Sequence, residues 1–159
     1  MPFLDLLPPP RIRTDLVVTG KPALIESLAD LLAVTGDERP AIRESLLARE
    51  QLGSTGLGRG VAIPHGRVAA LDQPRAAFIR LASPLDFEAI DGHPVDLVAA
   101  LVVPTHYTDG HLHLLAELAE MFSNSELTTR LRTAPDAPAL RDELAEFKRR
   151  QAEIEPWTD

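Results

Sequence analysis

The chain has 159 residues, of which 45% are apolar and only 4% aromatic, so we expect one domain with a largely aliphatic core. A formal net charge of −8 argues against nucleic acid or an anionic membrane as the main partner, and no apolar stretch approaches the roughly 20 residues that span a bilayer. Cysteine is absent, which excludes disulfides, thiolate chemistry and cysteine-based zinc sites, and a cytoplasmic location is the simplest interpretation.

The N-terminal part of the chain predicts an arm, one strand and two helices. Residues 1–10 end in three prolines, which predicts an extended arm, and they lack the basic residues of a secretory signal. Residues 11–18 alternate between apolar and polar side chains, as in a strand. Apolar residues at helical spacing predict helices over 21–34 and 38–52, the second capped by Asp37.

The rest of the chain predicts three more strands and three more helices. The strands are expected over 61–63, 76–82 and 96–103, and the helices over 108–122, over 127–131 and from the capping residue Asp136 onward. Residues 148–159 form a charged tail. This order of elements predicts an α/β fold in a single layered domain over residues 11–147, with a mixed β-sheet flanked by α-helices.

One histidine is placed for reactivity by the residues around it. Four glycines between residues 53 and 60 lead into the short apolar strand, which Pro64 ends just before His65. Proline holds an extended backbone, and the following Gly66 allows a sharp turn that leaves the imidazole uncrowded. No Gly-Lys-Ser/Thr follows the glycines, so the loop is not an ATP-binding Walker A motif.

The segment Leu47–Arg67, LAREQLGSTGLGRGVAIPHGR, resembles the signature of the IIA domains of the bacterial phosphoenolpyruvate-dependent phosphotransferase system, mannitol/fructose class. The spelling REQLGSTGLG is closest to the nitrogen-regulatory subgroup, and the resemblance extends from roughly Asp15 to Phe147. It implies a phosphotransferase component in which His65 accepts a phosphoryl group from an HPr-type phosphocarrier protein and forms a phosphohistidine. The segment HLHLLAEL matches the family's second histidine motif at His111, which is expected to position the phosphoryl group.

Helical geometry separates His111 from His113. Residues four, seven and eleven positions after His111 are all apolar, whereas those after His113 are all polar. Because these offsets share one face of a helix, His111 is expected to face the core and His113 the solvent. His111 also lies in the first helical turn, where free N–H groups and the helix dipole favour an anion such as a phosphoryl group.

Arg49 is the best cationic candidate for stabilising that phosphoryl group. It shares the inward face of its predicted helix with Ile42 and Leu46, and the family resemblance also implies an arginine near the active histidine. Arg59 and Arg67 are weaker candidates, and the hydroxyls of the Ser54–Thr55 pair either donate at the site or form the loop turn. The sequence does not indicate which imidazole nitrogen is attacked.

The remaining histidines do not predict a metal centre. His93 reads as a turn residue and His106 as a rim residue. A metal site built from His106, His111 and His113 is disfavoured because histidines two positions apart on a helix diverge and no carboxylate completes the set. We therefore expect neither a metal nor a cofactor.

Several functions remain open at this point. The leading one is a phosphocarrier of the nitrogen-regulatory type, whose phosphorylation state controls a regulatory target protein. The alternatives within the family are a sugar-specific IIA component that passes the phosphoryl group to a IIB domain for fructose/mannitol-type uptake, and a binding module that has lost phosphotransfer. A hydrolase with His65 as general base lacks a serine nucleophile elbow or a paired-carboxylate motif.

Overall fold

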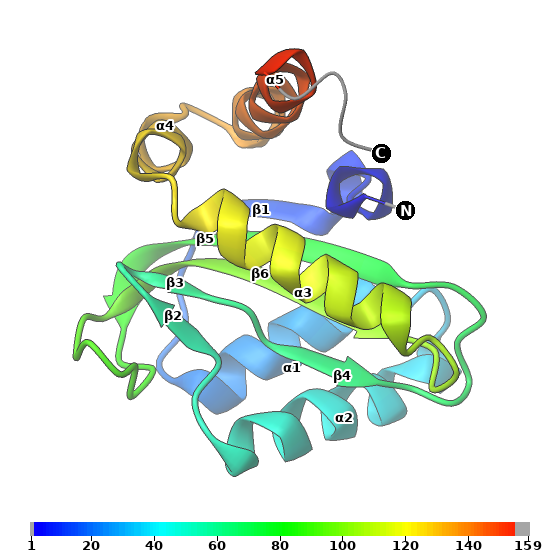
Figure 1. Cartoon of the computed structure of the whole chain (residues 1–159). Helices are drawn as coiled ribbons and strands as arrows, with labels where there is room; N and C mark the ends of the chain where they lie inside the picture. The colour runs from blue at the N-terminus through cyan, green and yellow to red at the C-terminus, as the bar shows by residue number, and fades with distance from the viewer. Residues whose placement is uncertain (1, 155–159) are drawn as a thin grey trace.

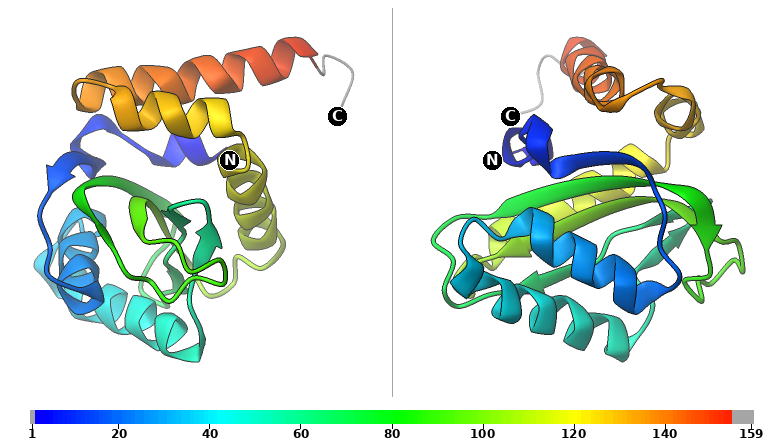
Figure 2. Two further views of the ribbon diagram at one scale, coloured as in Figure 1. Left: turned by 90° about the vertical axis from the view of Figure 1, so that its left-hand side faces the viewer. Right: turned by 180° about the vertical axis from the view of Figure 1, so that it is seen from behind.

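The computed structural model describes residues 2–154, which form a six-stranded mixed β-sheet between two layers of helices (Figure 1). One face of the sheet is covered by α1 (Lys21–Leu32) and α2 (Arg39–Leu52), and the other by α3 (Asp109–Phe122), α4 (Ser125–Thr133) and α5 (Ala137–Ile154). Two further views show the same layers (Figure 2). The predicted α/β fold with a mixed sheet flanked by helices is therefore confirmed.

The sheet has the order β1-β5-β6-β3-β2, and β4 also pairs with β6. The strands are β1 (Ile12–Leu16), β2 (Gly56–Gly58), β3 (Val61–Ala62), β4 (His65–Arg67), β5 (Arg75–Leu85) and β6 (Val95–Val103). β3 and β4 follow one another along the same side of β6 and run parallel to it, while β5 lies antiparallel on its other side. β6 is thus the strand against which the segment around His65 is aligned.

The two faces of β6 belong to two separate hydrophobic cores. Alternate side chains of a strand point to opposite faces, and both faces of this strand are covered by helices. Leu97, Ala99, Leu101 and Val103 pack in the core beneath α3–α5, whereas Val98, Ala100 and Val102 pack in the core beneath α1 and α2. This explains why the strand reads as a continuous apolar run in the sequence.

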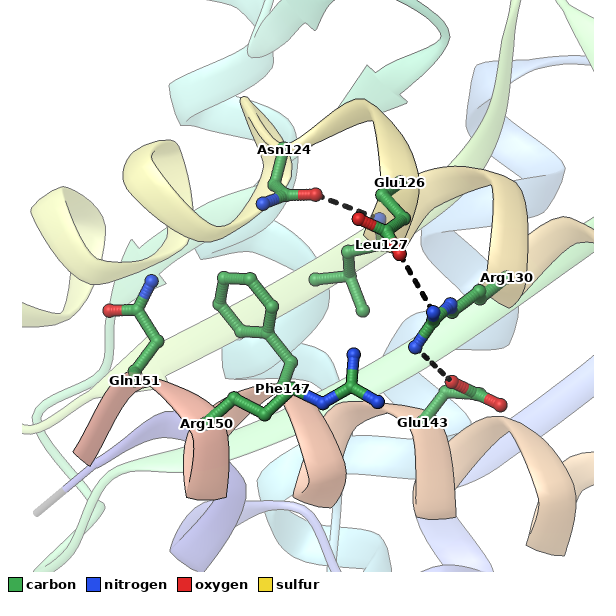
Figure 3. Close-up of a pocket in the computed structure, with 8 residues that line it drawn as sticks. All are labelled: Asn124, Glu126, Leu127, Arg130, Glu143, Phe147, Arg150 and Gln151. Atoms are coloured by element: carbon green, nitrogen blue, oxygen red, sulfur yellow. Dashed lines mark hydrogen bonds and ion pairs between the residues drawn. The ribbon is translucent and has the colours of Figure 1, made fainter. Parts of the chain in front are cut away.

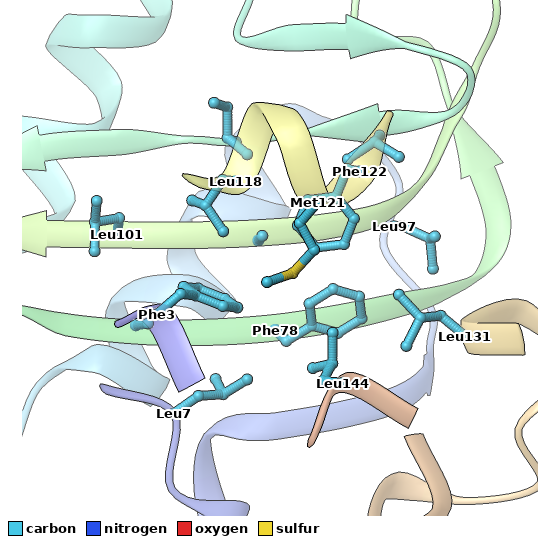
Figure 4. Packing of buried hydrophobic residues seen from close by; sticks show 14 of the residues in the cluster. Phe3, Leu7, Phe78, Leu97, Leu101, Leu118, Met121, Phe122, Leu131 and Leu144 are labelled. Atoms are coloured by element: carbon cyan, nitrogen blue, oxygen red, sulfur yellow. The ribbon is translucent and has the colours of Figure 1, made fainter. Parts of the chain in front are cut away.

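The N-terminal residues differ from the extended arm that their prolines predict. They form two short 3-10 turns (Phe3–Leu6 and Pro9–Arg11) rather than a free extended segment. Phe3 and Leu7 are fully buried against Phe78 and the helices above the sheet (Figure 4). The physical reason is that folding the segment onto the sheet removes the large apolar side chains of Phe3 and Leu7 from water, which a free extended arm would leave exposed.

The predicted N-terminal cap is correct for α5 but not for α2. Asp136 caps α5 as expected, its Oδ1 accepting a hydrogen bond from the backbone N–H of Ala139 at 2.9 Å. The prediction that Asp37 caps α2 was wrong. Residues 36–38 form a 3-10 turn, and Glu38 accepts the backbone N–H groups of the two residues before that turn at 2.9 and 3.1 Å.

The C-terminal end is helical for longer than the sequence indicates. α5 continues to Ile154, so the first part of the charged tail predicted over 148–159 is helical, and residues 155–159 lie outside the described part of the chain. Within residues 2–154, no helix is both long and apolar enough to cross a membrane. The predicted domain boundaries at residues 11 and 147 stay a prediction.

Candidate functional site

His65 is the first residue of β4, whereas the sequence predicts a strand that ends at Pro64, just before it. The backbone N–H of Leu101 donates to the carbonyl oxygen of Pro64 at 3.0 Å, and His65 then pairs with Leu101 in parallel register. The proline therefore interrupts the strand without ending it, because its carbonyl group still accepts a hydrogen bond although its nitrogen cannot donate one. The pairing with β6 fixes the position of the imidazole on the face of the sheet that α3 covers.

Gly66 is required for a close approach rather than for a turn. A β-carbon at this position would lie 2.0 Å from Oγ of Ser45 on α2. The same Ser45 hydroxyl donates to the backbone carbonyl oxygen of Arg67 at 2.9 Å. α2 is thus held directly against the face of β4 opposite His65, and the predicted role of Gly66 in a turn was wrong.

The His65 ring is held in one tautomer. Its Nδ1 lies 2.8 Å from the carbonyl oxygen of Ile63, which can only accept, so Nδ1 carries the proton and Nε2 keeps the lone pair. Burial and the charge of Arg49 lower the pKa of His65, while the Ile63 carbonyl and the charge of Glu50 act in the opposite direction. At neutral pH the ring is therefore neutral, with Nε2 as its nucleophilic atom.

His111 faces inward from the first turn of α3, as the helical spacing predicts. It is only 6% exposed, whereas His113 is exposed. Gly110 permits this start of the helix because a β-carbon there would lie 2.2 Å from the ring of Tyr107. The rings of His111 and His65 meet edge to face, with centroids 5.5 Å apart at an interplanar angle of 73°. The two predicted histidines are thus brought together from different parts of the chain.

The His111 ring carries an unused donor. Nε of Arg67 lies 3.4 Å from Nδ1 of His111, and a guanidinium can only donate, which leaves the ring proton on Nε2. Nε2 is buried and is the only buried side-chain polar atom among residues 2–154 without a hydrogen-bond partner. Burial, followed by the charges of His65 and Arg67, lowers the pKa of His111 to about 4, so the ring is neutral at pH 7.

Two arginines supply positive charge beside the histidine pair. Arg49 donates from a terminal nitrogen to the carbonyl oxygen of Gly53 at 2.9 Å, and its charge acts on His65. Arg67 contacts His111, although the sequence favours it only weakly. The sequence feature that could have identified Arg67 is its distance of two residues from His65, because residues two positions apart in a strand lie on the same face of the sheet. Arg59 instead donates to the carbonyl oxygen of Ser123 at 2.9 Å.

The other polar candidates serve the surrounding structure. Ser54 donates to the carbonyl oxygen of Phe87 at 2.6 Å, which ties the glycine loop to the β5–β6 connection. His93, His106 and His113 are exposed. In the described part of the chain, no three His, Asp or Glu side chains are grouped in a way that could hold a metal ion.

A cavity of about 280 Å³ lies elsewhere, between α4 and α5 (Figure 3). Phe147 and Leu127 form its apolar base, and Arg130 at its rim pairs with Glu126 at 2.7 Å. None of its lining residues belongs to the histidine pair or to the arginines beside it. The catalytic candidates lie on β4, near the end of α2 and at the start of α3, not in this cavity.

Comparison with known proteins shows to which family the chain is similar. Residues 5–147 match the family described as "Phosphoenolpyruvate-dependent sugar phosphotransferase system, EIIA 2". The chain is 43% identical over 138 residues to a nitrogen regulatory protein of Pseudomonas aeruginosa, covering 86% of this chain and 90% of that one. It is 35% identical over 128 residues to the fructose-specific EIIA component of Haloferax volcanii, covering 79% and 83%.

A solved structure extends the likeness to three dimensions. The crystal structure of the nitrogen regulatory protein IIA-Ntr from Neisseria meningitidis superposes with a TM-score of 0.83 at 41% identity, covering 89% of this chain and 97% of that one. The resemblance drawn from the segment Leu47–Arg67 is thereby confirmed. The chain belongs to the EIIA 2 family of the phosphoenolpyruvate-dependent sugar phosphotransferase system.

Proposed function

We propose that this chain is a phosphocarrier in which Nε2 of His65 accepts a phosphoryl group from an HPr-type protein, and that its phosphorylation state serves nitrogen regulation. The observation that carries the proposal is the pair of histidines. The His65 ring presents a free lone pair on Nε2, and the His111 ring holds a buried N–H that has no hydrogen-bond partner. The centroids of the two rings are 5.5 Å apart. Such an arrangement suits a small anion attached to His65.

The transfer step exchanges one phosphorus–nitrogen bond for another. The lone pair on Nε2 of His65 attacks the phosphorus of the donor's phosphohistidine, and the bond to the donor imidazole breaks with its electron pair left on the donor nitrogen. The proton on Nδ1 of His65 stays hydrogen-bonded to the carbonyl oxygen of Ile63 throughout. Because the bonds made and broken are alike, the protein's contribution is alignment and charge stabilisation.

The neighbouring groups divide that contribution. The N–H of His111 Nε2 donates to a phosphoryl oxygen, for which its position in a neutral, buried ring is suited. Arg49 and Arg67 balance the −1.5 to −2 charges, approximately, that a phosphoryl group carries. His111 and Arg49 thus keep the positioning and stabilising roles expected from the sequence, and Arg67 joins them.

The recipient of the phosphoryl group is the finer question. Identity of 43% to a nitrogen regulatory protein favours a regulatory target protein. The 35% identity to a fructose-specific EIIA component keeps a IIB domain in sugar uptake as the second candidate. A cytoplasmic location, which phosphoenolpyruvate as the original donor requires, stays a prediction.

Intact mass under alkaline conditions tests the proposal. The protein is incubated with phosphoenolpyruvate, the first enzyme of the system and HPr, using wild type, His65→Ala and the control His113→Ala. We expect wild type and His113→Ala to gain one acid-labile phosphoryl group and His65→Ala to gain none. No uptake by wild type, with donors active on a known acceptor, would refute phosphotransfer and favour a binding module.

A further inference from the structure

We infer that Glu50 is a positioning residue for His65, acting through Thr55 and Ile63 on the hydrogen bond that fixes the imidazole tautomer. This inference deepens the proposed function. The positioning role itself is argued from the hydrogen bonds, and only its effect on phosphoryl transfer rests on the proposed function. Neither Glu50 nor Thr55 contacts the imidazole by a hydrogen bond, so neither is a catalytic residue.

Glu50 is a buried carboxylate that joins three segments of the chain. Its side chain is only 5% exposed and pairs with Nζ of Lys21, the first residue of α1, at 2.9 Å. The same carboxylate accepts hydrogen bonds from the hydroxyl of Thr55 and, at 3.3 Å, from its backbone N–H. The end of α2, the start of α1 and the glycine loop therefore meet at this one side chain.

The backbone carries the constraint from Thr55 to His65. The N–H of Ile63 donates to the carbonyl oxygen of Thr55 at 3.0 Å, and the carbonyl oxygen of Ile63 accepts from Nδ1 of His65 at 2.8 Å. Anchoring Thr55 thus anchors the peptide that selects the tautomer. A displaced Ile63 carbonyl would no longer hold the proton on Nδ1, and the lone pair would no longer be reserved for Nε2.

The ion pair also controls charge beside the nucleophile. Nζ of Lys21 lies 4.7 Å from the centroid of the Phe87 ring, so the ammonium group contacts both this ring and the Glu50 carboxylate. Its lysine partner offsets part of the Glu50 charge, so the carboxylate still raises the pKa of His65 but repels an incoming phosphoryl group less than an unpaired carboxylate would. Replacing a buried ion pair by apolar residues is often neutral or stabilising, so stability alone is a weak reason for this arrangement.

Nitrogen-15 NMR of the His65 imidazole tests the inference without a phosphoryl donor. The variants are Thr55→Val, which removes the hydroxyl but keeps the ion pair, Thr55→Ser, which restores the hydroxyl, and Glu50→Gln, which removes the charge. The matched controls are Thr128→Val, at a buried threonine on α4 that donates to Ser125, and Glu38→Gln, in the ion pair with Arg75 at 2.8 Å.

We expect Thr55→Val to populate the tautomer with the proton on Nε2, and Thr55→Ser to restore the wild-type tautomer. Glu50→Gln should lower the pKa of His65 further, because a negative charge that raises this pKa is lost. Both controls should keep the wild-type tautomer and pKa at His65 even where they lower the melting temperature. Phosphoryl acceptance should slow by about tenfold or more in Thr55→Val and Glu50→Gln.

The outcomes separate this inference from the proposed function. If folded Thr55→Val and Glu50→Gln both keep the wild-type tautomer and pKa at His65, Glu50 has only a structural role and the inference is wrong. If the NMR changes occur as expected but wild type accepts no phosphoryl group, the positioning network stands and the proposed function fails.

Discussion

The buried, partnerless nitrogen of His111 makes a measurable prediction about stability. Replacing His111 by leucine, of similar size, removes an unsatisfied donor that costs about 1–3 kcal/mol when buried. The substitution also loses the 3.4 Å hydrogen bond from Arg67 and the edge-to-face contact with His65, together worth about 1 kcal/mol. At pH 7.5 we therefore expect His111→Leu to be as stable as wild type or up to about 2 kcal/mol more stable.

The pH dependence of the same substitution gives the sharper result. The pKa of His111 is about 4 in the folded protein and ordinarily near ~6.5, so the unfolded chain takes up the proton first. Wild type therefore loses stability as the pH falls from the unfolded value toward the folded one. Linkage gives a loss of about 2.5 kcal/mol at pH 4.5 from this one ring, and His111→Leu is free of it.

Urea denaturation at pH 7.5 and pH 4.5 measures this difference. The gap in unfolding free energy between His111→Leu and wild type should widen by about 2.5 kcal/mol on going to the lower pH. The control His113→Leu, at an exposed position on the same helix, should follow wild type at both values. A gap between His111→Leu and wild type that stays constant with pH would refute the reasoning that burial keeps this ring neutral.

Three further substitutions test the packing that positions the site. Gly66→Ala should destabilise the protein by about 1–3 kcal/mol, because its new methyl group would meet Oγ of Ser45. Adding Ser45→Ala should recover part of this loss in a double-mutant cycle. Equal losses with and without Ser45→Ala would contradict the proposed clash. Phe3→Ala should cost about 3–5 kcal/mol by urea denaturation, a loss that a free arm would not produce. Arg80→Met should lower the free energy of unfolding by about 3 kcal/mol, and with it the melting temperature, because the buried guanidinium donates to three backbone carbonyl groups at the end of α4. An unchanged melting temperature would mean that water satisfies these carbonyl groups equally well.

The sequence is sufficient for the parts of this fold that depend on local pattern. Helical spacing gives α3 and places His111 inward and His113 outward, because a regular period converts directly into a face. The apolar run of β6 is recognisable because a strand covered by helices on both faces needs no polar positions. Asp136 is a correct cap because its partner lies three residues away in the chain.

The errors arise where distant segments decide the local structure. Pro64 reads as the end of a strand, but pairing with β6 continues the strand beyond it. For the same reason the sequence favours Arg67 only weakly, because its position on the face of His65 depends on that pairing. Three prolines read as an extended arm, but two buried side chains from that segment, Phe3 and Leu7, complete a core built mainly by residues far along the chain. The residues next to Gly66 in the sequence do not predict its contact with α2, because that contact depends on the register of β4 in the sheet.

At the histidine pair, stability and the proposed function oppose each other. A chain with a net charge of −8 concentrates two guanidiniums beside two neutral imidazoles, and it pairs the nearby carboxylate of Glu50 with Lys21. In the unphosphorylated protein this arrangement leaves a buried donor unsatisfied and gains little from the cations. A dianionic group on Nε2 of His65 would satisfy the donor and neutralise the cations at once. The same features that cost stability would therefore favour the proposed phosphorylated state, which is the electrostatic preorganisation expected of a group-transfer site.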